Sequence, residues 1–337
     1  MLPFAVAKRT VPLLLLVLSA CSGPQQQVRP DKPVDTPTLG EDAILMEDGY
    51  RLPLRHWLPT GKPHAVILAL HGFNDYSNAF ASTASYLRQH AIAMYAVDQR
   101  GFGESAQTGL WAGEARMQAD LLTATRLLCH RYPDTPVYLM GESMGGAVIL
   151  QSATALQASC AAGVILSAPA VWGWETMPWW QALALRMMAH IAPAMTVTGE
   201  GLDIRPSDNI DMLRALGRDP LVIKKTRIDA IYGLTDLMQS AHTHSIELRL
   251  PTLLLYGEQD EIITPAPICD MLENLGDLAS TGWRMLLYPD GFHMLTRDLQ
   301  AARVHGDIAA WLGDRTTRLP SGLEVGEDMP RLQALCK

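Results

Sequence analysis

Short, continuous runs of apolar residues alternate along this chain with longer stretches in which apolar residues return every three or four positions. A strand that is apolar on both faces belongs inside a parallel sheet covered by helices, and the longer spacing is typical of amphipathic helices. The pattern predicts an α/β fold with a mostly parallel central sheet and right-handed crossovers. We expect strands at 65–70, 92–97, 137–140, 164–166, 252–256 and 284–288, and helices at 78–90, 117–132, 144–158, 266–275 and 298–312.

The alternation of strand and helix is interrupted once, between Pro169 and Glu247, where only helical spacing is found. We therefore expect an α/β core at 41–169 and 248–312, with a helical lid at 170–247 inserted after the strand at 164–166. A hairpin around Asp48-Gly49 is expected at the start of the core, because Asp-Gly strongly favours a tight turn. The tail, 313–337, lacks a strong pattern and is predicted to be a loosely packed extension.

The first forty residues differ from the rest. Lys8-Arg9 precede an apolar run at 11–18 that is too short to span a membrane, which is the layout of a secretory signal peptide at 1–20. The residues Leu18-Ser19-Ala20-Cys21 resemble the lipobox of bacterial lipoproteins. That resemblance implies cleavage before Cys21, lipid on this cysteine, and anchoring in a bacterial envelope membrane; Ser22 favours the outer membrane, facing the periplasm. The alternative is an ordinary signal peptide that leaves a free cysteine.

The region 21–40 is rich in proline and glutamine and is predicted to be an extended tether that follows the lipidated cysteine. With 337 residues and 48% hydrophobic residues, the chain can bury one large core. Its formal net charge of −8 and the lack of a Lys/Arg cluster argue against a nucleic-acid partner.

Four cysteines follow Cys21, and in an oxidising compartment they permit two disulfides in three pairings. We favour Cys129 with Cys160, because both fall near the ends of helices expected to run side by side, and Cys269 with Cys336 by elimination. Four buried thiols are the alternative. None of the cysteines has metal-ligand spacing, and no cofactor is expected.

The segment Val137 to Ala147 has the pattern of a buried strand, a sharp turn and a helix, with Ser143 at the turn. Gly141 and Gly145 complete a G-x-S-x-G motif, in which small residues let the backbone bend so that the serine projects from the sheet edge. The same bend directs the backbone N–H of Met144 toward the place where an oxyanion would form. Ser143 is therefore the predicted nucleophile.

A nucleophilic serine needs a histidine, and the histidine needs an anion to hold its tautomer. Of the ten histidines, His293 follows the last expected strand, and Asp260 follows the strand before it. Loops after neighbouring parallel strands lie side by side, so these residues are predicted to meet near Ser143. Glu258 and Glu261 are rivals for the acid. The order Ser, Asp, His is that of α/β-hydrolases.

A second oxyanion donor is expected from the loop after the strand at 65–70, and Phe73 is the candidate. His71 stands on the wrong strand to be the base and is interpreted as a residue that stabilises its loop. The glycine-rich stretch 98–105 lacks a helix placed for phosphate binding, so it is predicted to be a packed turn in which Arg100 forms structural ion pairs.

Together these motifs resemble the monoacylglycerol lipase and lysophospholipase branch of the α/β-hydrolases, often described as serine aminopeptidase-like hydrolases. The resemblance covers about Ala43 to Leu312 and rests on His71-Gly72-Phe73, the turn at 98–105, Met140 to Gly146, Gly257-x-x-Asp260 and Gly291-x-His293; Arg218 to Val222 in the lid is similar too. It implies hydrolysis of lipid-like esters by Ser143, Asp260 and His293. The family usually has glycine where Asn74 stands and often histidine where Glu142 stands.

Three functions are compared. The first is an ester hydrolase for monoacylglycerol- or lysophospholipid-type substrates that forms an acyl-enzyme on Ser143. In it, an acyl chain would lie beneath the lid tryptophans Trp172, Trp174, Trp179 and Trp180, although lid packing or contact with a bilayer would also explain them. The second is a proline-releasing aminopeptidase that grips an amine with Glu175, Glu200 and Asp203. The third is a non-catalytic lipid-binding lipoprotein. The sequence leaves the oligomeric state open.

Overall fold

The computed structural model describes residues 23–28, 33–34, 36–199, 201, 203–276, 278–325 and 330–337. The predicted signal peptide, the predicted lipidation site Cys21 and the proposed amine ligand Glu200 lie outside these residues. In the described part of the chain, no helix combines the length and the apolar character that crossing a bilayer requires.

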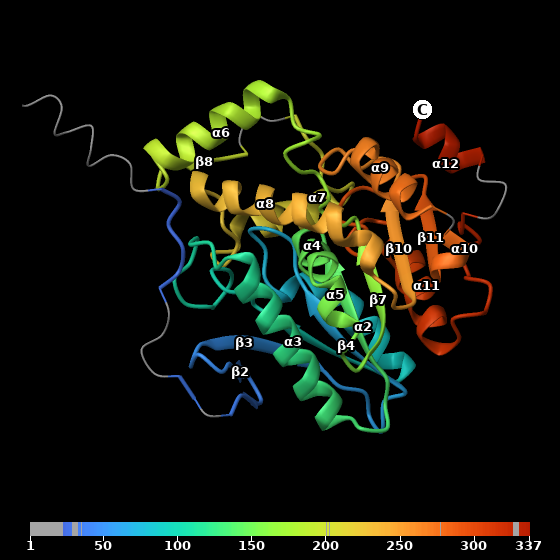
Figure 1. The fold of residues 1–337 in the computed structure, drawn as a ribbon. Coiled ribbons are helices and arrows are strands. Elements are labelled where there is room, and N and C mark those ends of the chain that lie inside the picture. Colours follow the sequence, from blue (N-terminus) through green and yellow to red (C-terminus); the bar gives the residue numbers. More distant parts are fainter. Residues whose placement is uncertain are drawn as a thin grey trace, which may run out of the picture.

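A nine-stranded sheet forms the centre of the molecule, in the order β1-β2-β3-β5-β4-β6-β7-β10-β11 (Figure 1). The first three strands are antiparallel to their neighbours, and the six from β5 to β11 are mutually parallel. The predicted α/β fold class is therefore confirmed. The strands are β1 (Thr38–Leu39), β2 (Ala43–Leu45), β3 (Arg51–Trp57), β4 (Ala65–Leu70), β5 (Ile92–Val97), β6 (Val137–Glu142), β7 (Ala161–Ser167), β10 (Thr252–Gly257) and β11 (Trp283–Tyr288).

Helices cover both faces of the sheet, and each face has its own apolar cluster. On one face lie α3 (Glu114–Arg131), α4 (Met144–Gln151), α5 (Ala153–Leu156), α8 (Ile228–His244), α9 (Pro265–Leu275), α10 (Leu278–Thr281) and α12 (Pro330–Leu335). On the other lie α2 (Ala81–Leu87), which the 3₁₀ turns η1 (Ser77–Phe80) and η2 (Arg88–His90) flank, and α11 (Ala301–Gly313).

The insertion between β7 and β10 contains α6 (Trp179–Ile191), α7 (Ile210–Arg218), α8 and the 3₁₀ turn η3 (Ser245–Glu247). It also holds a two-stranded pair, β8 (Thr196–Val197) with β9 (Thr226–Arg227), which the sequence pattern did not reveal because each strand has only two residues. Helix α8 packs against both α4 and α6, so it lies between the core and the outer layer of the insertion (Figure 1).

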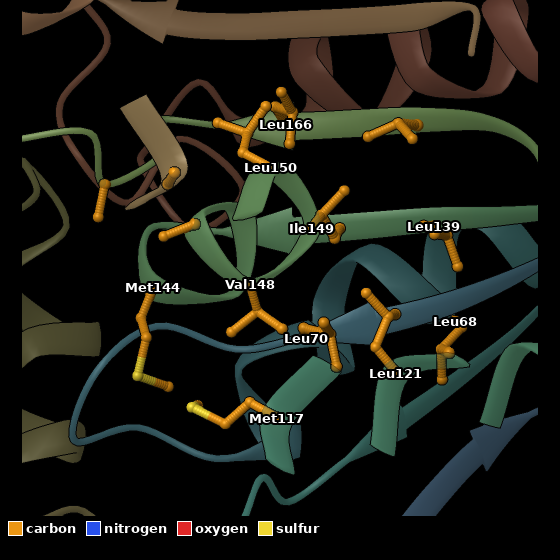
Figure 2. Close-up of a cluster of buried hydrophobic side chains, with 14 of the residues drawn as sticks. Leu68, Leu70, Met117, Leu121, Leu139, Met144, Val148, Ile149, Leu150 and Leu166 are labelled. Atoms are coloured by element: carbon orange, nitrogen blue, oxygen red, sulfur yellow. The ribbon is translucent and has the colours of Figure 1, made fainter. Parts of the chain in front are cut away.

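Helix α4 approaches the sheet very closely. A Cβ at Gly145 would clash with the carbonyl oxygen of Leu70 in β4, so only glycine fits. Figure 2 shows Met144 and Val148 of α4 pointing toward Met117 of α3 and Leu70. These side chains are buried, and their packing fixes the start of α4 against the carboxyl end of β4.

The expected helix 144–158 is two helices, α4 and α5, separated at Ser152. The hydroxyl of Ser152 donates to the carbonyl oxygen of Val148, at 2.7 Å. A side chain that bonds to the carbonyl four residues earlier competes with the helical hydrogen bond and is associated with bending.

The carboxyl-terminal extension is not loosely packed, as the sequence suggested. Glu324 forms an antiparallel bridge with Leu286 and an ion pair with Arg284, both on the edge strand β11. Leu319 and Leu332 are buried. The extension therefore covers an edge that would otherwise present unpaired backbone groups.

The prediction of an extended tether is wrong for residues 25–28. Gln26 forms a parallel bridge with Trp111, and Gln27 donates its backbone N–H to the carbonyl of Trp111 at 3.0 Å. The sequence pattern missed these contacts because the segment has no apolar periodicity and bonds through its backbone and amide groups.

Two disulfides join Cys129 to Cys160 and Cys269 to Cys336, the pairs favoured from the sequence. The first links the end of α3 to the start of β7, and the second links α9 to the carboxyl-terminal extension.

We predict that Gly145→Ala lowers the free energy of unfolding by about 1–3 kcal/mol, because the added methyl group must displace α4 or β4. Gly217→Ala is the matched control: a Cβ there meets nothing within 4 Å, and alanine stabilises a helix by about 0.5–1 kcal/mol relative to glycine. The free energy of unfolding of each variant is measured in urea with both disulfides intact. Equal effects would contradict the close approach.

Candidate active site

Ser143 occupies a strained turn between β6 and α4. Its φ is +52° and its ψ is −114°, a conformation rare for any residue other than glycine. Its N–H donates to the carbonyl oxygen of Ser167 on the neighbouring strand β7, at 3.0 Å, which helps to hold the turn. A Cβ at Gly141 would collide with the backbone of Gly145 and Gly146, so the predicted need for small residues around the serine is met.

Asp260 and His293 meet at the same edge of the sheet, after β10 and β11. Nδ1 of His293 donates to Oδ2 of Asp260 at 2.8 Å, and both side chains are buried. The other carboxylate oxygen, Oδ1, accepts the N–H groups of Ile262 and Ile263, at 2.8 and 2.9 Å. Asp260 therefore fixes both the orientation and the tautomer of the imidazole.

With Nδ1 engaged, Nε2 of His293 forms no hydrogen bond to any described residue, Ser143 included. In free enzymes, catalytic hydrogen bonds are often long and tighten when substrate binds. The loop that carries His293 nevertheless reaches the nucleophile turn, because Thr296 Oγ1 donates to Glu142 Oε2 at 3.1 Å. Glu142 is the residue immediately before Ser143.

The rival acids have other partners. Glu258 forms an ion pair with Arg331 of the carboxyl-terminal extension. Glu261 accepts the N–H of Arg205, at 2.7 Å. Of the three carboxylates considered, Asp260 alone among these described residues bonds to His293.

The two expected oxyanion donors lie on either side of the turn. A Cβ at Gly72 would lie 3.4 Å from Cβ of Ser143, so the loop that carries Phe73 runs beside the serine. Met144 is the first residue of α4, whose amino-terminal N–H groups have no partner within the helix. Neither N–H, of Phe73 or of Met144, finds an acceptor among the described residues, so both are free to bind an oxyanion.

His71 stabilises the neighbouring loops, as the sequence analysis predicted. Its Nδ1 donates to the carbonyl of Gly72 at 2.8 Å, and its Nε2 accepts the N–H of Gln99 at 3.0 Å. Burial lowers the pKa of this imidazole, which suits a neutral ring with one donor and one acceptor. Arg100 likewise forms the expected ion pairs, with Asp48 and Asp120.

A buried arginine, which the sequence pattern does not indicate, lies at the centre of the site. The guanidinium of Arg297 pairs with Glu142 through Nη2 and with Asp75 through Nη1, the latter at 2.7 Å. All three side chains are at most 8% exposed. Burial alone would lower the pKa of Arg297, but the two carboxylates outweigh it and raise the pKa, so the cation is secure.

The ion pairs of Arg297 join three segments of the site. They are the oxyanion loop, which includes Asp75, the nucleophile turn, which Glu142 immediately precedes, and the histidine loop, which includes Arg297 itself. The only sequence signal was the departure at Glu142, a carboxylate inside an otherwise apolar strand end. A buried carboxylate needs a cation, but no feature of the sequence singles out Arg297, which lies 155 residues away.

The second departure from the family pattern, Asn74, has a left-handed backbone with φ of +65°. After glycine, asparagine is among the residues that best tolerate this conformation. Its side chain also donates to Thr226 Oγ1 of the lid at 2.7 Å, and its carbonyl accepts the N–H of Ile223 at 2.9 Å. Asn74 therefore permits the left-handed backbone of the turn, and its hydrogen bonds join the oxyanion loop to the lid.

The four lid tryptophans, which are predicted to line the substrate site, lie in different surroundings. Trp174 packs inside the lid: Arg186 stacks on its ring, and its N–H donates to Asp236 at 2.7 Å. Trp179 and Trp180 on α6 are 77% and 57% exposed, and α8 lies between α6 and α4. Trp172 alone of the four packs against the main core cluster.

Two further expectations concern ligands. Glu175 and Asp203, two of the suggested amine ligands, are exposed. Within the described ranges, no three His, Cys, Asp or Glu side chains gather as a metal site would require.

Asp298 connects the histidine loop to the lid. Its Oδ2 accepts the N–H of Phe292 at 2.8 Å, and its Oδ1 accepts the hydroxyl of Ser207 from the lid. Burial raises the pKa of Asp298 to about 6, although both hydrogen bonds oppose the shift.

Comparison with known proteins adds to this geometry. Residues 61–300 match the profile of the family described as "Serine aminopeptidase, S33" (Hydrolase_4). The chain is 25% identical to mouse monoglyceride lipase over 298 residues, covering 86% of this chain and 96% of the relative. It is 22% identical to monoacylglycerol lipase of Mycolicibacterium smegmatis over 287 residues, covering 82% and 97%.

Among solved structures, a soluble variant of monoglyceride lipase from Saccharomyces cerevisiae, in complex with a substrate analog, is similar with a TM-score of 0.66. It is 20% identical, and the match covers 86% of this chain and 98% of that one. At this identity the likeness bears on the fold alone.

We predict that Arg297→Met lowers the free energy of unfolding by about 3–5 kcal/mol, because it leaves two buried carboxylates without their cation. Arg303→Met is the control: Arg303 is exposed on α11, and its loss is expected to change stability by no more than about 0.5 kcal/mol. Denaturant unfolding at neutral pH measures both. Similar losses for the two variants would refute a central role for Arg297.

Asp298 also predicts a pH dependence. Its folded-state pKa, about 6, lies above the unfolded value near 3.8, so its contribution to stability is present below pH 3.8 and is lost as pH rises through 6. Relative to Asp298→Asn, the wild type should lose about 2–3 kcal/mol between pH 4 and pH 7. Unfolding of both proteins at several pH values tests this, and parallel curves would contradict it.

Proposed function

We propose, from the premise that this chain belongs to the serine aminopeptidase S33 (Hydrolase_4) family of α/β-hydrolases, that this carboxylic ester hydrolase cleaves lipid-like esters through an acyl-enzyme on Ser143. Monoacylglycerols and lysophospholipids are the proposed substrate class. The buried hydrogen bond between His293 and Asp260, on the same sheet edge as Ser143, is the observation that carries the proposal.

In the proposed reaction, Oγ of Ser143 attacks the ester carbonyl carbon while Nε2 of His293 takes the hydroxyl proton. The negative charge that builds on the carbonyl oxygen is held by the N–H groups of Phe73 and Met144. Asp260 stabilises the imidazolium. As the carbon–oxygen bond to the leaving group breaks, His293 returns the proton to the alcohol, for example glycerol, which departs.

The acyl-enzyme is then hydrolysed by the same groups. His293 takes a proton from water, the hydroxide attacks the acyl carbon, and the fatty acid leaves as Oγ of Ser143 recovers its proton. The chain therefore needs no cofactor for this chemistry. The names of its relatives, monoglyceride and monoacylglycerol lipases, support an acylglycerol over an amide substrate.

We also propose that the protein is exported and carries lipid on Cys21, which anchors it in a bacterial envelope membrane, at the outer membrane facing the periplasm. The lipobox-like residues 18–21 support this proposal. A lipid anchor would keep the active site close to substrates that themselves partition into bilayers.

The test compares wild type with Ser143→Ala. We expect a fluorophosphonate probe to label wild type alone, and the variant to lose at least about a thousandfold in turnover of p-nitrophenyl esters. A series of monoacylglycerols and lysophospholipids of increasing chain length then defines the substrate, with prolyl-naphthylamide as the amide control. Faster turnover of the amide would favour an aminopeptidase, and an unlabelled wild type would favour a lipid-binding protein without catalysis.

A further inference from the structure

The segment Gln25 to Val28, here called the strap, is bound on both sides. On the core side, Gln27 donates through Nε2 to the carbonyl of Leu110 at 2.9 Å, and Val28 exchanges two hydrogen bonds with the side chain of Gln107, at 2.9 and 3.0 Å. Together with the bridge between Gln26 and Trp111, these bonds fix the strap on the loop before α3.

On the lid side, the strap reaches the start of α8. The N–H of Gln25 donates to Oδ2 of Asp229 at 3.2 Å, and its side-chain oxygen accepts from Arg227 at 2.8 Å. Asp229 is only 1% exposed and is held by a bidentate pair with Arg227. The strap therefore ends on an ion pair of the lid whose carboxylate is buried.

That ion pair adjoins the end of α6. The N–H of Asp229 donates to the carbonyl of Pro193 at 3.1 Å, and the N–H of Ile228 donates to that of Met195 at 2.9 Å. Pro193 lies two residues after α6, so Asp229 links Gln25 to the residues that follow this helix. Figure 1 shows the strap, in dark blue, beside α6 and the start of α8.

Helix α6 carries an apolar stripe on its outer face. Its members recur every four residues and are 51–77% exposed: Trp179, Leu183, Met187 and Ile191. Residues at this spacing share one face of a helix. The opposite face packs inward, where Ala182 and Ala189 are buried. His190, which is exposed, contacts the ring of Tyr232 in α8.

The stripe is unusual for a surface that faces water. Trp180 on the same helix and Met195 beyond it are also exposed, at 57% and 44%. An exposed apolar face on a helix is typical of a segment that lies in the membrane interface, where tryptophan is favoured.

The position of the strap limits where an anchor can be. An extended residue spans at most about 3.5 Å, so the four-residue step from Cys21 to Gln25 can be at most about 14 Å long. A free tether over 22–40 would have allowed the domain to face any direction. A docked strap instead fixes the anchored end of the chain beside the carboxyl-terminal end of α6.

We propose that the strap sets the orientation of the enzyme on the membrane: the lipid on Cys21 holds the α6 stripe in the interface of the same bilayer, with the lid turned toward the lipid substrate. The occupant of the stripe is thus a bilayer surface. This inference rests on the lipidation of Cys21 contained in the proposed function.

The experiment uses the full, processed lipoprotein in phosphatidylethanolamine and phosphatidylglycerol vesicles. A nitroxide is attached to Met187→Cys in the stripe or, as a control, to Leu58→Cys, which is 45% exposed after β3. Power saturation of the nitroxide's electron paramagnetic resonance signal, with oxygen and a water-soluble nickel chelate as relaxing agents, reports whether the label is immersed in the bilayer. We expect the label at 187 to be immersed and the label at 58 to face water. A label at 187 that reads water in vesicle-bound protein would overturn the proposal.

Two insertions test the strap itself. A flexible Gly/Ser spacer of about 20 residues between Ser22 and Gly23 separates the anchor from the strap, whereas the same spacer between positions 29 and 30 leaves them adjacent. The first should reduce immersion at 187 and lower hydrolysis of a vesicle-embedded monoacylglycerol about three- to tenfold, because effective concentration falls with tether length. The second should change neither. Equal effects would mean that the strap does not orient the enzyme.

Other outcomes remain distinguishable. Turnover of soluble p-nitrophenyl butyrate should be unchanged in both spacer variants, and a wild type without this activity would defeat the proposed function while leaving the nitroxide result intact. A mature amino-terminal peptide without lipid, seen by mass spectrometry, would overturn the inference. So would a disulfide-linked dimer of Met187→Cys on vesicles, which would assign the stripe to a second copy of the chain.

Discussion

The arrangement of the active site depends on one buried guanidinium. Arg297 sits between Glu142 and Asp75, in a place where an isolated carboxylate would cost several kcal/mol. Asp75 and Arg297 lie in loops, and Glu142 ends β6 directly before the nucleophile turn. Each of these three segments adjoins one functional group: an oxyanion donor, the base or the nucleophile. Because the ion pairs hold all three segments together, the segments cannot shift independently without exposing or unpairing a charge.

The close approach of α4 to β4 provides the complementary constraint. Gly145 lets the helix touch the strand, and the packing of Met144 and Val148 holds it there, so the conformation of Ser143 is imposed by its surroundings rather than by its own preference. Asn74 has a similar role on the other side of the site, where a left-handed turn is hydrogen-bonded to Thr226 and Ile223 of the lid. Core, oxyanion loop and lid are therefore mechanically linked.

The sequence revealed the parts of this design that follow from strand ends. Ser143, Asp260 and His293 each come directly after a buried apolar run, and parallel strands place such positions at one edge. The pairing of Arg297 with Glu142 and Asp75 was hidden, because its partners are 155 and 222 residues away and charged residues usually indicate surface. The strap and the carboxyl-terminal extension were hidden too, since they bind through backbone and amide groups, which leave no hydrophobic period.

The pairing of the cysteines has a consequence for biogenesis. Along the chain after Cys21, the first cysteine bonds to the second and the third to the fourth. A polypeptide that is threaded through a membrane from its amino terminus and oxidised as thiols emerge would join consecutive cysteines. The consecutive pairing is therefore the connectivity that this chain, exported as proposed, would reach without reshuffling of wrongly joined thiols.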